Sequence, residues 1–92
     1  MDQKGGTAVE KNRRILRRGR VIDATGRPIA GALVSIVWGT LPTTDIARRT
    51  NDEGVFQVGI EPGRYRLQAV KSDVISEVEV EGGEGGEIII VI

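Results

Sequence analysis

The chain has 92 residues, enough for one domain with one hydrophobic core; 39% of them are hydrophobic and only 3% are aromatic. It contains no cysteine and no histidine, which excludes a disulfide scaffold, zinc–thiolate sites and the commonest general base and metal ligand. The formal net charge is zero, which argues against a general polyanion as the partner.

The charges are nevertheless separated along the chain. Residues 73–92 hold six acidic residues and no basic one. Residues 1–20 hold two acidic residues and seven basic ones, namely Lys4, Lys11, Arg13, Arg14, Arg17, Arg18 and Arg20. The first twelve residues carry too few apolar side chains to repay the entropy of ordering them. We therefore expect a disordered basic arm over residues 1–13 and one folded domain over residues 14–92.

Short runs of alternating or continuous apolar residues, separated by turn formers, fill the rest of the chain. They are the segments 15–23, 31–39, 45–50, 56–60, 64–69, 74–81 and 87–92. Segment 31–39 is apolar on both faces, which indicates a central strand or an outer face that something covers, and segment 45–50 is expected at an edge. Seven strands at roughly ten-residue spacing, with no helical period, predict an all-β, seven-stranded antiparallel β-sandwich of Greek-key type.

Turn-forming residues separate these strands. Asp23 can bond forward to the backbone at the first turn, and the second turn is Asn51 to Gly54. A positive φ is expected at Gly26, Gly54 and Gly63.

Three blocks of residues carry a family resemblance. The first block is Gly19-x-Val21-x-Asp23-x-x-Gly26-x-Pro28-Ile29-x-Gly31-Ala32-x-Val34; the others are Thr50-x-Asp52-x-Gly54-x-Phe56 and Pro62-Gly63-x-Tyr65-x-Leu67. In this order the chain resembles the carboxypeptidase regulatory-like domain, a sandwich of the transthyretin-like (prealbumin-like) type, over about Leu16 to Ile92. The resemblance implies a non-catalytic module and often an extracellular or periplasmic place. The shared positions belong to turns and core, so they indicate fold and not a specific role.

A basic cluster begins in the arm and continues into the first strand. Its members Arg13, Arg14, Arg17, Arg18 and Arg20 are predicted to add electrostatic attraction to an acidic partner. Nucleic acid is the alternative, and it is disfavoured because no aromatic residue interleaves with the basic residues.

The acidic residues Glu77, Glu79 and Glu81 share one face of a strand. A calcium site is disfavoured because they form a flat row and not a cage of six to eight ligands, so no metal site is predicted. They are expected to pair across strands with Arg17, Arg64 or Arg66, or to protect an edge from aggregation.

The last strand is apolar on both faces, since the chain ends in five β-branched residues, Ile88 to Ile92. Either both faces are buried or another subunit covers one of them. The candidates for this second apolar surface are Leu33, Val37, Ile75, Ile89 and Val91. They predict self-association or docking to another protein.

No catalytic constellation is recognisable, because no acidic residue pairs with a nucleophile at a known spacing, and no cofactor is predicted. Trp38 is expected to point inward with Ile36, which makes it a weak platform for a sugar ring. The sequence thus predicts a non-catalytic structural or protein-interaction module, with carbohydrate or nucleic-acid binding as the alternative. No window of about 18 apolar residues spans a bilayer and no secretory signal is visible, so the expectation is a cytoplasmic protein.

Overall fold

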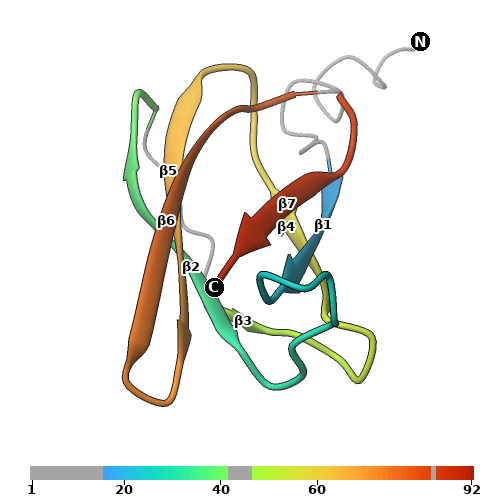
Figure 1. The fold of residues 1–92 in the computed structure, drawn as a ribbon. Helices are drawn as coiled ribbons and strands as arrows, with labels where there is room; N and C mark the ends of the chain where they lie inside the picture. Colours follow the sequence, from blue (N-terminus) through green and yellow to red (C-terminus); the bar gives the residue numbers. More distant parts are fainter. Residues whose placement is uncertain (1–15, 42–46, 84) are drawn as a thin grey trace, which may run out of the picture.

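A computed structural model describes residues 16–41, 47–83 and 85–92, and the expected arm, residues 1–13, lies outside these ranges. The described residues form strands and no helix (Figure 1). The strands are β1 (Leu16–Ile22), β2 (Leu33–Gly39), β3 (Arg48–Arg49), β4 (Val55–Gly59), β5 (Arg64–Lys71), β6 (Val74–Glu81) and β7 (Ile88–Val91). The all-β fold class predicted from the alternating pattern is confirmed.

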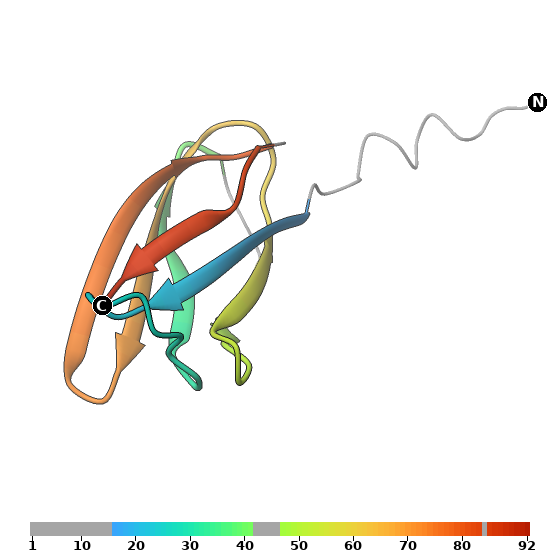
Figure 2. The same ribbon diagram turned by 45° about the vertical axis from the view of Figure 1, so that its right-hand side comes forward.

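The strands form two sheets that face each other as an unclosed sandwich (Figures 1 and 2). One sheet has the order β4-β1-β7, and the other has the order β3-β2-β5-β6. The second strand is therefore central and the third lies at an edge, as predicted. The pair β1 and β7 is parallel, whereas an antiparallel arrangement was expected throughout. The parallel pair arises because the chain crosses from β6 to the other sheet before β7, so no hairpin links β7 to β1.

The core lies between the sheets and consists of alternate side chains from both. Its buried members are Val21, Ala32, Val34, Phe56, Val58, Ile60, Tyr65, Leu67, Ala69, Ile88 and Ile90. Each large apolar side chain buried in this way stabilises the fold by about 1.5–3 kcal/mol. Gly19 on β1 allows the Phe56 ring to cross the strand, since a Cβ at Gly19 would lie 2.2 Å from the ring.

Side chains of turn residues hold the two predicted turns. Asp23 Oδ1 accepts hydrogen bonds from the Thr25 and Arg27 amides at 2.9 and 3.0 Å. Asn51 Oδ1 accepts hydrogen bonds from the Glu53 and Val55 amides, both at 2.9 Å. Positive φ angles occur where they were expected, at Gly26, Gly54 and Gly63.

Trp38 departs from the predicted alternation. The register of β2 against β5 shifts after Ile36: Ile36 lies opposite Leu67, whereas Trp38 lies opposite Arg66. Val37 is the extra residue of this β-bulge, which reverses the side to which the following residue points. Trp38 is consequently 49% exposed. The prediction that it points inward with Ile36 is wrong, because the period-two pattern holds only as far as the bulge.

Candidate functional site

The outer face of the three-stranded sheet carries an apolar cluster. The register places Arg20 between Val55 and Ile89, and it places Ile22 beside Val91. Ile89 and Val91 are 38% and 51% exposed, and Ile22 and Val55 are half-buried. We call these four apolar residues the β7 patch.

Leu33, Val70 and Ile75 form one row across β2, β5 and β6 on the outer face of the four-stranded sheet. Leu33 and Ile75 are exposed, and Val70 is half-buried. Val37 is also exposed but lies at the bulge, farther along β2.

The five predicted surface residues therefore do not form one surface. Leu33, Val37 and Ile75 belong to one sheet, whereas Ile89 and Val91 belong to the other. The two groups point away from the core on opposite layers of the sandwich. Strand alternation indicates which residues point outward, but it does not indicate which sheet a strand joins.

The predicted pairing of the acidic row with arginine is confirmed for Arg66. Its Nη2 lies 2.8 Å from Glu79 Oε2, and its Nε lies 4.0 Å from Glu77 Oε1. The hydrogen bond from Arg66, strengthened by charge attraction, lowers the pKa of the Glu79 carboxyl below its ordinary value. Glu77 also accepts a hydrogen bond from Gln68 Nε2 at 3.2 Å. These residues form cross-strand pairs on the outer face of β5 and β6.

The predicted basic cluster is divided in the structure. Arg13 and Arg14 lie outside the described residues. Arg18 and Arg20 are exposed on β1, and both reach Glu87, with Nε to carboxylate distances of 3.4 and 3.3 Å. The two arginines carry two positive charges and Glu87 carries one negative charge, so one net positive charge lies next to the β7 patch.

Arg17 differs from its neighbours because it is 9% exposed. Its guanidinium donates hydrogen bonds to the carbonyls of Glu81 at 2.7 Å, Gly83 at 3.2 Å and Gly86 at 2.7 Å. It therefore holds the connection between β6 and β7 and does not act as part of an exposed basic arm. The signal that could have revealed this is its spacing, since Arg17 has the same parity as the inward-pointing Gly19 and Val21.

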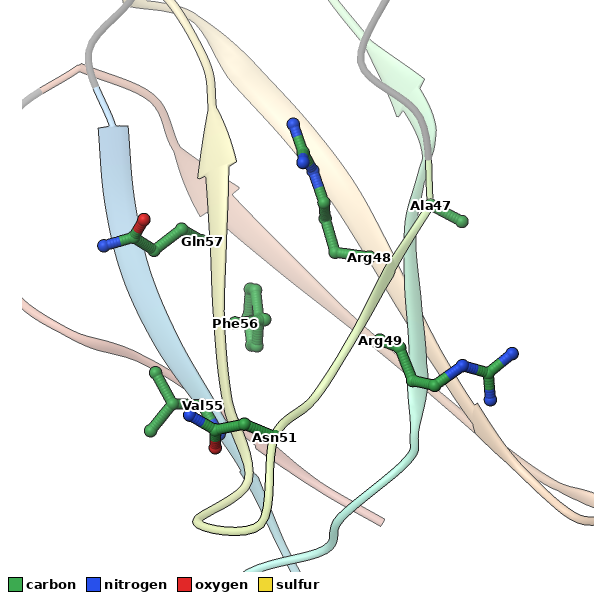
Figure 3. Close-up of a pocket in the computed structure, with 7 residues that line it drawn as sticks. All are labelled: Ala47, Arg48, Arg49, Asn51, Val55, Phe56 and Gln57. Atoms are coloured by element: carbon green, nitrogen blue, oxygen red, sulfur yellow. The ribbon is translucent and has the colours of Figure 1, made fainter.

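A groove of about 560 Å³ lies between β3 and β4, which are the edge strands opposite to β6 and β7 in the two sheets. Figure 3 shows Arg48 and Phe56 between the two strands, whereas the Arg49 side chain points away from β4. The other lining residues are Ala47, Asn51, Val55 and Gln57. None of these seven side chains is a carboxylate, hydroxyl, thiol or imidazole, so they supply no general base or nucleophile.

Two further properties follow from the described residues. Within residues 16–41, 47–83 and 85–92, no three acidic, histidine or cysteine side chains cluster in a way that could hold a metal ion. The same ranges contain no helix that is long and apolar enough to cross a bilayer.

The fold and these surfaces define a class of small β-sandwich that presents apolar and charged surfaces on a packed core. The chain belongs to the carboxypeptidase regulatory-like domain family, whose model matches residues 18–91. This family consists of non-catalytic regulatory modules. A search of curated proteins finds no match.

Proposed function

We propose that the chain is a non-catalytic docking module that binds a protein through the β7 patch. The observation that carries the proposal is the exposure of Ile89 and Val91 on a sheet face where polar residues would be expected. An uncovered apolar cluster on a β-strand is an aggregation hazard, and a protein partner would remove it.

The surroundings of the patch indicate the chemistry of the partner. Arg18 and Arg20 share one carboxylate, that of Glu87, so one positive charge remains at the edge of the patch. A partner surface with apolar side chains and a carboxylate beside them would complement it. An apolar centre with a charged rim is the usual arrangement of a protein interface.

The substitution Ile89→Lys tests this proposal, because it places a charge in the centre of the patch. If the partner is a second copy, light scattering after size-exclusion chromatography should show a mass above that of the monomer for the wild type. The variant should then have the mass of a monomer. Gln57→Lys is the matched control, since Gln57 is exposed on the same sheet face beside Arg18 and outside the patch.

If both proteins are monomers, the partner is a different protein. Affinity capture from the native host with quantitative mass spectrometry should then recover a protein with the wild type and with Gln57→Lys, but not with Ile89→Lys. Equal recovery with all three proteins, together with unchanged masses, contradicts the proposal.

Carbohydrate binding is a second candidate, which the exposed Trp38 favours. The bulge places the indole on the outer sheet face opposite Arg66, in the register row next to Ser35 and Gln68. An exposed indole next to hydrogen-bonding groups can stack on a sugar ring. A glycan array would show binding by the wild type and none by Trp38→Ala; absence of binding by both proteins excludes this candidate.

A further inference from the structure

The inward side chains of β6 are less covered than those of its neighbour β5. Tyr65, Leu67 and Ala69 point inward from β5 and are at most 1% exposed. Their cross-strand partners Val80, Val78 and Ser76 are all only half-buried. The sandwich is therefore incompletely closed along β6.

The hydrogen-bond pattern of β6 leaves one edge unpaired. The Gly82 amide donates to the Gly63 carbonyl at 2.7 Å, which shows that even-numbered residues of β6 direct their backbone groups toward β5. The backbone groups of the odd-numbered residues Ile75, Glu77 and Glu79 point away from β5. The structure gives these groups no hydrogen-bond partner within residues 16–41, 47–83 and 85–92.

The edge of β7 faces this unpaired side of β6. The Ile92 amide donates to the Ile22 carbonyl at 2.8 Å, so the even-numbered residues of β7 direct their backbone groups toward β1. The backbone groups of the odd-numbered residues Ile89 and Val91 point toward β6. Figures 1 and 2 both show β7 approaching β6 toward the C-terminal end of β7.

At each end of the gap between β6 and β7, a side chain donates a hydrogen bond to an edge carbonyl. Ser76 Oγ donates to the Val91 carbonyl at 2.7 Å, and Arg17 Nη1 donates to the Glu81 carbonyl at 2.7 Å. Between these contacts lies a groove of about 410 Å³. Val78, Val80 and Ile88 provide apolar side chains to its lining, and Arg17, Glu87 and Ile89 also line it.

We propose that an extended peptide segment of a partner protein adds as a strand along the unpaired edge of β6 and enters this groove with its inward side chains. The backbone of the segment would pair with Ile75, Glu77 and Glu79, and its inward side chains would cover Val78 and Val80. Its outward side chains would lie next to the Glu77 and Glu79 carboxylates. The segment should therefore alternate apolar residues with lysine or arginine. Ile89 belongs to both surfaces, but the residues that would pair with the segment lie on β6, outside the β7 patch, so the inference remains valid if docking at that patch fails.

Charge argues against the chain itself as the occupant. Pairing of β6 with β6 of a second copy would bring glutamates next to glutamates, which is destabilising. Residues 1–15 of the chain do not alternate apolar with basic residues. Segment 64–67 does alternate in this way, but it belongs to β5, which is already paired with β6.

A synthetic peptide that alternates valine with lysine tests the proposal by NMR titration of the full chain. Addition of the peptide should shift the amide signals of Ile75, Glu77 and Glu79 and slow their hydrogen exchange. A matched peptide that alternates valine with glutamate should bind about tenfold more weakly, because each outward pair becomes repulsive. Equal binding of both peptides, or shifts confined to other strands, overturns the proposal.

Two variants at one position separate backbone pairing from charge attraction. Glu77→Pro removes an amide that points away from β5, so the sheet keeps its own hydrogen bonds while the incoming strand loses one. Glu77→Ala removes the same carboxylate and keeps the amide. Binding that is lost in Glu77→Pro and retained in Glu77→Ala supports strand addition, whereas an equal loss in both contradicts it.

Folding of Glu77→Pro is checked by circular dichroism. If this variant is unfolded, Glu77→Lys replaces it and should reduce the preference for the valine–lysine peptide over the valine–glutamate peptide. An unchanged preference overturns the proposal. Light scattering of the free chain adds one more test, since a dimer in which the amides of Ile75, Glu77 and Glu79 exchange slowly would show that a second copy is the occupant and would overturn the proposal.

Discussion

β5 and β6 are neighbours in one sheet with the same alternation of side chains, yet their surroundings differ. Tyr65, Leu67 and Ala69 on β5 are fully buried, whereas Ser76, Val78 and Val80 are half-buried on β6. Both edges of β5 are paired, whereas β6 is paired on one side alone in the described sheets. Alternation therefore determines which face is apolar, and the position in the sheet determines how well that face is covered.

The largest effect is expected from the side chain that links β6 to the rest of the fold. Arg17→Met keeps much of the buried volume but leaves the carbonyls of Glu81, Gly83 and Gly86 without their donor. Loss of charge-assisted hydrogen bonds at a buried site should lower the free energy of unfolding by about 3 kcal/mol. Urea denaturation followed by circular dichroism measures this loss.

Arg18→Met is the control for Arg17→Met, because Arg18 lies on the same strand and is exposed. Its ion pair with Glu87 is at the surface, so the expected change is within about 0.5 kcal/mol. Similar losses in both variants would show that Arg17 does not hold the connection from β6 to β7.

A matched pair of valine substitutions tests the difference in coverage within the sheet. Val34→Ala on β2 removes two methyl groups from a fully buried site, which should cost about 2–3 kcal/mol. Val78→Ala on β6 removes the same groups from a half-buried site and should cost about 1 kcal/mol. Equal costs in urea denaturation would mean that β6 is as well covered as β2.

The turn between β5 and β6 offers a smaller, stabilising change. Ser72 has a φ of 56°, in the left-handed region, within a two-residue hairpin loop. Ser72→Gly should raise the free energy of unfolding by about 0.5 kcal/mol, because glycine adopts this conformation without steric cost. Asp73→Gly is the control, since its φ is not positive, and thermal unfolding should show a lower midpoint for it than for the wild type.

The smallest effect concerns the exposed pair of Glu79 with Arg66. Because the pKa of Glu79 is lowered in the folded state, its contribution to stability is present above the ordinary value of 4.5. That contribution is lost as the pH falls through the lowered pKa. Thermal unfolding should therefore distinguish wild type from Glu79→Gln at neutral pH and low salt, and the difference should vanish in acid. A difference that grows in acid would contradict this assignment.

The sequence predicted the strands and turns well, because alternation and turn formers are local signals. Asp23, Asn51 and Gly54 occupy the turns expected of them, and the row of Glu77 and Glu79 pairs with Arg66. Family membership followed from the same turn and core residues.

The candidate surfaces were less predictable, because they depend on contacts between distant segments. Assignment of Leu33 and Ile89 to opposite faces depends on the order of strands in two sheets. The exposure of Trp38 depends on a bulge that the register of β2 against β5 creates. Arg17 is buried because carbonyls some 64–69 residues away surround its guanidinium.

Amide hydrogen exchange of the free chain, resolved by residue along β6, shows whether this edge is unpaired. Slow exchange is expected for Ser76, Val78 and Val80, whose amides bond to β5, and fast exchange is expected for Ile75, Glu77 and Glu79. Slow exchange at all six amides in the monomer would contradict this expectation, because it would show that another part of the chain already pairs with the open edge of β6.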